Sequence, residues 1–194
     1  MTRLCRYGDS GQAFPVYITV VGGLLFLAFA YLAVGQAAVN RNGAQTAADA
    51  AALAAAVNTR DELADQWVKD VLDPTKWQDI FDGHVDVADS CWRAAELAAQ
   101  NDATAQCTPE PPLSYKVDAE TNKTVGDSVV PGTENMKSTA AATAVIEPLC
   151  TFTLSGAAGV LPELTCRDRN WTLDPTDLTH LPGPEDLFDV HLAD

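Results

Sequence analysis

Basic residues are scarce in this chain, and that scarcity excludes several classes of partner. The 194 residues contain 12 Lys and Arg against 27 Asp and Glu, which gives a net charge of −15. Residues 1–12 contribute +1, through Arg3, Arg6 and Asp9, so the rest of the chain carries −16. Proteins bind nucleic acid and anionic lipid headgroups through clustered Lys and Arg. We therefore expect neither as a partner.

Motifs for catalysis are also missing. The chain has no His-Glu-x-x-His sequence, no glycine-rich phosphate loop and no Cys-x-x-Cys pair. Residues 8–11 read Gly-Asp-Ser-Gly, as around a serine-protease nucleophile, but all three histidines lie beyond the apolar run described next, so Ser10 has no base. His84, Asp86 and Asp89 are possible cation ligands, although such residues before a helix are typically solvated or cap it. We expect no enzyme activity, catalytic residue, metal, cofactor or small-molecule substrate.

Charged residues are absent from residues 10–40, and residues 14–34 are almost wholly apolar. At about 1.5 Å per residue, a helix of that length crosses the roughly 30 Å hydrocarbon core of a bilayer. A cleaved signal peptide is the alternative, but the run exceeds the usual apolar core of about 7–15 residues. We expect a transmembrane helix over residues 13–39. Arg3 and Arg6 precede it, so the positive-inside rule predicts a single-pass cell-membrane protein with residues 1–12 in the cytoplasm and the C-terminal part outside.

Alanine dominates the next segment, residues 40–72, which contains neither proline nor any glycine after Gly43. Alanine is the best helix former, so the helix is predicted to continue to about residue 71. Small side chains let helices approach closely. The face formed by Ala47, Ala48, Ala51, Ala52 and Ala55 is expected to pack either on a neighbouring helix or on the protein's own domain.

The remaining chain predicts a small α+β domain over residues 73–171. Asp73 and Pro74 end the long helix, because proline cannot continue the hydrogen-bond ladder. The patterns that follow predict helices at residues 75–81 and 88–100, a loop at 101–112, antiparallel strands at 113–120 and 139–147 joined by a loop at 127–136, and short strands within 151–171. Residues 172–194 are acidic and interrupted by proline, so we expect a mobile tail.

Four of the five cysteines lie after the apolar run. An even number in an exported domain indicates two disulfides, for which three pairings exist. The equal separation of Cys91 from Cys107 and of Cys150 from Cys166 favours sequential pairing. Zinc is the other use of four cysteines, but the absence of a Cys-x-x-Cys pair and an oxidising location disfavour it.

Gly11, the apolar helix, Arg41 and the alanine-rich residues 44–56 together resemble the TadE/TadG-like family, the pseudopilin-like accessory proteins of Flp (tight adherence) pilus machines. The most specific part is Gln-x-Ala-Ala-Asp-Ala-Ala-Ala-Leu-Ala at residues 45–54. The remainder looks similar to a short actinobacterial TadG-like branch of that family.

The chain departs from the family in two places. Processed prepilins carry glutamate five residues after the cleaved glycine, whereas Gly8 and Gly11 lead here to Ala13 and Val16. Larger TadG proteins also carry an adhesive domain with an Asp-x-Ser-x-Ser metal site, which residues 86–90 do not match. Neither prepilin processing nor metal-dependent adhesion is therefore implied.

The resemblance implies a non-enzymatic, membrane-anchored accessory or minor-pilin-like component of a Tad/Flp pilus assembly system. Its expected partners are the lipid bilayer and Tad pilus or secretion membrane proteins or pilins. The alternative left open is a single-pass extracytoplasmic binding or cell-envelope protein unrelated to pili.

Overall fold

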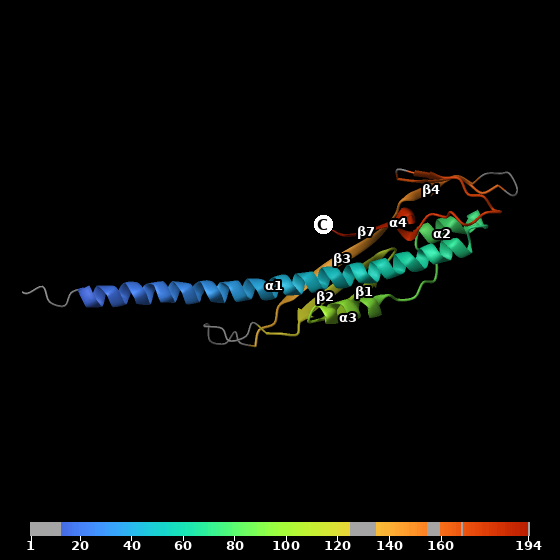
Figure 1. The fold of residues 1–194 in the computed structure, drawn as a ribbon. Helices are drawn as coiled ribbons and strands as arrows, with labels where there is room; N and C mark the ends of the chain where they lie inside the picture. The colour runs from blue at the N-terminus through green and yellow to red at the C-terminus, as the bar shows by residue number, and fades with distance from the viewer. Residues whose placement is uncertain (1–12, 125–134, 155–159, 168, 194) are drawn as a thin grey trace, which may run out of the picture.

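One long helix organises the whole fold. The computed structural model describes residues 13–124, 135–154, 160–167 and 169–193. Helix α1 (Ala13–Lys69) has 57 residues and is therefore about 85 Å long. Its second half runs through the folded domain, and its first half projects from it (Figure 1). The expectation of a continuous helix to about residue 71 is confirmed within two residues.

Three short helical segments lie between α1 and the first strand. Pro74 opens the 3₁₀ helix η1 (Pro74–Lys76), which leads into α2 (Trp77–Phe81). The indole N–H of Trp77 donates to the carbonyl of Asp70 at 3.1 Å, and the same oxygen accepts the Asp73 N–H at 2.9 Å. Helix α3 (Cys91–Gln100) begins three residues later than predicted. Its first N–H, on Cys91, bonds to Asp89 Oδ1 at 2.8 Å.

The main sheet has four antiparallel strands in the order β1-β2-β3-β7. Its strands are β1 (Ala103–Glu110), β2 (Ser114–Thr121), β3 (Thr139–Pro148) and β7 (Phe188–Leu192). The antiparallel pairing predicted between residues 113–120 and 139–147 is confirmed by β2 and β3. The loop expected between them lies mostly outside the described residues.

Strand β1 corrects the sequence analysis, which expected a loop at residues 101–112. The Asn, Asp, Thr and Pro content of that segment is typical of loops, yet Ala103 through Glu110 pair in full register with β2. Pairing with a neighbouring strand and packing against α3 outweigh the local preference. Pro109 is tolerated because β1 is an edge strand.

The acidic C-terminal segment is a second correction, because residues 184–192 of the expected mobile tail are a helix and a strand. Helix α4 (Pro184–Leu187) and strand β7 form within it, and β7 pairs with β3. Leu187 and Phe188 are 0% and 1% exposed. The many acidic residues concealed the apolar pair Leu187 and Phe188 in the sequence. At the start of α4, Asp186 accepts a hydrogen bond from the Gly183 N–H at 2.9 Å. This segment therefore belongs to the core.

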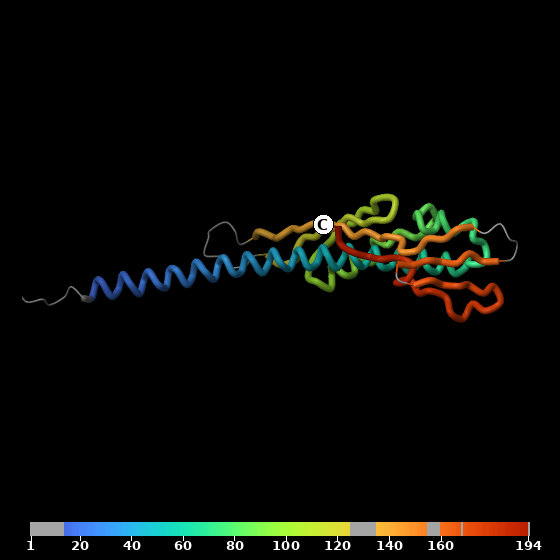
Figure 2. The backbone as a smooth tube through the Cα atoms, turned by 90° about the horizontal axis from the view of Figure 1, so that it is seen from above, coloured from blue at the N-terminus to red at the C-terminus, as the bar shows by residue number. Residues whose placement is uncertain are grey.

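The short strands predicted within residues 151–171 are confirmed as a separate three-stranded sheet. It consists of β4 (Cys150–Phe152), β5 (Leu164–Cys166) and β6 (Arg169–Trp171), all antiparallel. Seen from above, β7 and this second sheet lie along the half of α1 far from its N-terminus (Figure 2). Both α1 and α3 pack on the main sheet, on the face to which Tyr115, Val117 and Ala119 of β2 point. That layer forms the core.

Candidate membrane anchor and assembly site

The first half of α1 exposes an unbroken apolar surface. The large apolar side chains there are between 52% and 80% exposed: Phe14, Val16, Tyr17, Ile18, Val20, Leu24, Leu25, Phe26, Leu27, Phe29, Tyr31, Leu32, Val34 and Val39. Soluble domains rarely leave so large an apolar patch in water. Among the described residues, α1 is the one helix long and apolar enough to span a membrane.

The alanine face of α1 packs inside the protein's own domain. Its members are all 0% exposed: Ala44, Ala47, Ala48, Ala51, Ala52, Ala55 and Ala56. The second half of α1 contacts β2, β3, β7 and α3, which fill this face. Of the two neighbours expected for it, the domain is therefore the one present. Alanine suits this position because its small side chain lets the sheet and α3 approach the helix closely.

A buried polar cluster joins α1 to the domain. The Thr59 hydroxyl lies 2.7 Å from the Ser90 hydroxyl and 2.8 Å from the Tyr115 hydroxyl. Asn58 adds a bond from its Nδ2 to Ser90 Oγ at 3.1 Å. These residues come from α1, the start of α3 and β2, so three separate segments meet at one point. Sequence reasoning missed the cluster, since no local pattern marks Thr59 or Tyr115 as partners.

The two disulfides have the predicted sequential pairing. Cys91–Cys107 links the first residue of α3 to β1, and Cys150–Cys166 links paired positions of β4 and β5. Each closes a 16-residue separation. On the chain-entropy model, each such loop stabilises the fold by roughly 3 kcal/mol. The first bond holds an edge strand in place, and the second holds the small sheet together.

Aromatic side chains tie the far end of α1 to the second sheet and the C-terminal strand. Trp67 and Trp77 have ring centroids 5.3 Å apart, and Trp77 meets Phe152 of β4 edge-on at 5.2 Å. Phe81 continues the cluster to Phe152 and to Phe188 of β7, at 6.0 and 5.5 Å. This cluster gives the acidic C-terminal segment its apolar partner.

Asp70 and Lys76 form an ion pair at the same end of α1. Lys76 Nζ donates to Asp70 Oδ1 at 2.6 Å, and Gln66 Nε2 donates to Asp70 Oδ2 at 2.5 Å. The hydrogen bond from Lys76 lowers the pKa of Asp70 below its ordinary value, and the same bond raises the pKa of Lys76. This ion pair connects η1, which contains Lys76, to the turn at the end of α1, which contains Asp70.

The cation ligands considered from sequence do not assemble into a site. Within the described residues no group of three or more His, Cys, Asp or Glu side chains could hold a metal ion. Of His84, Asp86 and Asp89, the last has a clear local role, because it accepts the first N–H of α3. Ser10 lies outside the described residues.

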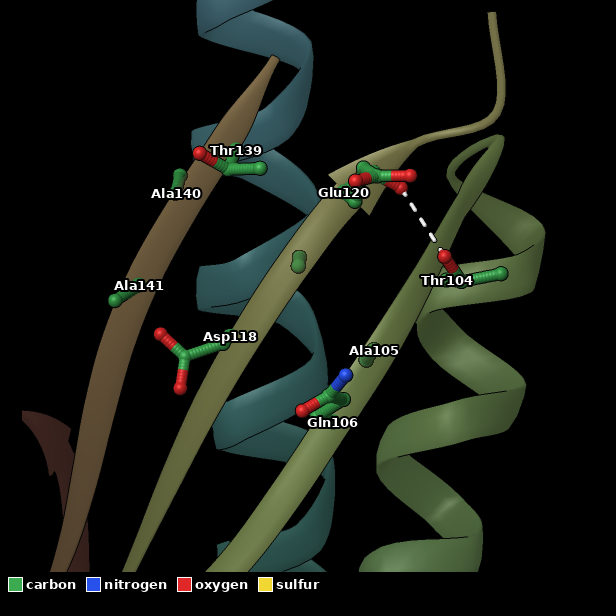
Figure 3. Close-up of a pocket in the computed structure, with 9 residues that line it drawn as sticks. Thr104, Ala105, Gln106, Asp118, Glu120, Thr139, Ala140 and Ala141 are labelled. Atoms are coloured by element: carbon green, nitrogen blue, oxygen red, sulfur yellow. Dashed lines mark hydrogen bonds between the residues drawn. The ribbon is translucent and has the colours of Figure 1, made fainter. Parts of the chain in front are cut away.

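Within the described part of the chain no helix covers the outer face of the main sheet, which has a shallow hollow (Figure 3). It is lined by parts of three strands: Thr104, Ala105, Gln106, Asp118, Ala119, Glu120, Thr139, Ala140 and Ala141. The Thr104 hydroxyl reaches the Glu120 carbonyl at 3.5 Å. In Figure 3, Gln106 of β1 and Asp118 of β2 lie side by side, as register partners, and Ala141 of β3 is the next residue across the sheet. We assign this hollow no chemistry.

These features define a class of protein: an α+β domain, held by two disulfides, built directly on a helix suited to spanning a membrane. Residues 11–58 match the model of the Flp pilus-assembly TadE/G-like family, so the chain carries a TadE/G-like segment there. The resemblance seen in the sequence is confirmed over that range. Neither a curated protein nor a solved structure matches the chain. The matched range takes in the exposed apolar half of α1 and its buried alanine face.

Proposed function

We propose that this protein is a non-enzymatic accessory component, of the minor-pilin-like kind, in a Tad/Flp pilus assembly system. One observation carries the proposal. The residues that match the pilus-assembly family, 11–58, coincide with the exposed apolar part of α1 and its continuation into the domain core. The part shared with pilus-assembly proteins is thus the membrane helix and its attachment to the domain.

The mechanism that we propose is mechanical. Helix α1 has no break between its exposed and buried halves, and its buried half is central to the core. A change in the position of the helix within a membrane or a helical assembly would therefore move the domain as one body, without a flexible linker. The acidic domain would set the contacts with pilins or with other Tad membrane proteins.

We further propose that the N-terminus is cytoplasmic and the domain extracytoplasmic, on the charge distribution and the disulfides. A membrane-impermeant thiol label applied to intact cells tests this. The label is expected to reach a cysteine placed at Thr176, which is exposed, and not Cys5. Labelling of Cys5 without cell lysis would reverse the proposed orientation.

A clean gene deletion tests the role in pilus assembly. Loss or shortening of pili is expected, with recovery on expression of the wild-type chain. Gly23→Leu provides a sharper variant, because a Cβ at Gly23 would meet nothing within 4 Å inside the chain. If α1 packs closely on another membrane helix, the larger side chain obstructs that contact, and Gly23→Ala serves as the matched control. Normal pili in the deletion strain would instead favour an envelope binding protein unrelated to pili.

A further inference from the structure

A groove lies where α1 leaves the domain. Its volume is about 630 Å³. One wall is a face of α1 that includes Tyr31, Leu32, Gly35 and Val39. The other consists of two residues after α3 and three at the end of β2: Asn101, Asp102, Thr121, Lys123 and Thr124. Gly35 leaves the floor open, since a Cβ there would meet nothing within 4 Å.

The groove is continuous with the apolar surface of α1. Tyr31 and Leu32 belong to the exposed apolar half, and Gly43 at the other end of the groove adjoins the first buried residue, Ala44. From Tyr31 to Gly43 the helix rises about 18 Å, comparable to the depth of the interfacial region and the adjoining acyl chains. If α1 spans the membrane, the groove therefore opens into the outer surface of the bilayer.

The domain end of the groove presents opposite charges side by side. Lys123 Nζ and Asp102 Oδ2 are 2.8 Å apart, and their side chains are 76% and 71% exposed. Both residues line the groove, as does Asn40.

We propose that this groove seats one phospholipid of the surrounding bilayer, with a zwitterionic headgroup of the phosphatidylethanolamine type; the inference rests on the proposed membrane location. The lipid phosphate accepts from Lys123, and its ammonium group meets the Asp102 carboxylate. The acyl chain lies along Leu32 and Gly35. An anionic headgroup is disfavoured by the net charge of −16 on residues 13–194. A free phosphate would leave the apolar wall uncovered.

Site-specific photo-crosslinking of the full chain tests the proposal. The chain is placed in vesicles of equimolar phosphatidylethanolamine and phosphatidylglycerol, with p-benzoylphenylalanine at Val39, and the mass of each adduct is measured. Ala38 is the matched control position, since it is exposed at the same depth but does not line the groove. A third position, Leu27, lies in the apolar half and reports membrane insertion.

The expected result is a phosphatidylethanolamine adduct at Val39 in clear excess over Ala38. Lys123→Met should abolish the preference between the two lipids, and Gly35→Leu should lower the Val39 adduct to the Ala38 level. Lys137→Met is the control, because Lys137 pairs with Glu120 at 2.8 Å near the same end but does not line the groove.

Three outcomes would overturn the proposal. Equal adduct yields at Val39 and Ala38, or a preference for phosphatidylglycerol at Val39, would contradict the lipid site. If Leu27 still gives lipid adducts in that case, the membrane location itself stands. A crosslink from Val39 to protein would assign the groove to a protein partner. Absence of lipid adducts at Leu27 would reject the membrane location together with the site.

Discussion

The hydroxyl of Thr59 lies 2.8 Å from that of Tyr115, although 56 residues separate them along the chain. Thr59 is on α1 and Tyr115 on β2, and they are 3% and 6% exposed. Their contact joins α1 to one of the two inner strands of the main sheet. The Thr59 hydroxyl also hydrogen-bonds with the Ser90 hydroxyl at the start of α3. This one side chain therefore links α1 to both β2 and the start of α3.

Replacement of Thr59 tests this junction. Thr59→Val keeps the shape but leaves the Ser90 and Tyr115 hydroxyls without this partner, so the free energy of unfolding should fall by about 1–3 kcal/mol. Urea denaturation of the detergent-solubilised chain, followed by tryptophan fluorescence, measures it. Thr151→Val, at an exposed position, is the control and should have little effect. Equal stability of both variants would show that the cluster does not stabilise the junction.

The alanine face predicts an effect on the domain rather than on contacts between molecules. Ala51 is fully buried, so Ala51→Leu should overpack the core and lower the free energy of unfolding by about 1–3 kcal/mol. Ala38→Leu is the matched control, because Ala38 is exposed on the same helix. The same denaturation assay applies. A stable Ala51→Leu domain with a specific loss of assembly would instead place this face in an intermolecular seam.

The C-terminal segment offers a direct test of its place in the core. Leu187 is 0% exposed, whereas Leu178 is 38% exposed. Leu187→Ala should destabilise the domain by about 2–5 kcal/mol, since it leaves a cavity. Leu178→Ala should cost much less. Limited proteolysis and denaturation together measure the difference, and similar behaviour of the two variants would contradict the burial of α4.

The ion pair at the end of α1 predicts a pH dependence. Because the Lys76 hydrogen bond lowers the pKa of Asp70 below 3.8, the pair stabilises the folded state at pH values above 3.8. That contribution is lost as the pH falls through the lower folded pKa. Lys76→Met should therefore lower the melting temperature slightly near neutral pH, and the difference from wild type should shrink in acid.

Lys116→Met, on the outer face of the sheet, controls for the loss of one positive charge. The effect of Lys76→Met should be small, because exposed ion pairs contribute little. A difference from wild type that persists unchanged in acid would show that Lys76 acts through packing and not through the Asp70 carboxylate.

The sequence was sufficient to predict the parts of this protein whose structure depends on residues close together in the chain. The apolar run, the alanine-rich continuation and Pro74 together determined where α1 begins and ends. Alternation of apolar and polar residues determined β2, and the equal cysteine spacings indicated both disulfides. Each of these features depends on periodicity, propensity or spacing within a short stretch of chain.

Only the tertiary structure decided which surfaces meet. Residues 103–110 have the composition of a loop but become β1, because β2 offers a partner and Cys91 a disulfide. Residues 184–192 are acidic but become α4 and β7, because Leu187 and Phe188 fill a space beside α1 and the aromatic cluster. The alanine face could have met another helix, but the sheet and α3 bury it. In each case the deciding free energy comes from burial against residues distant in sequence, which no local pattern contains.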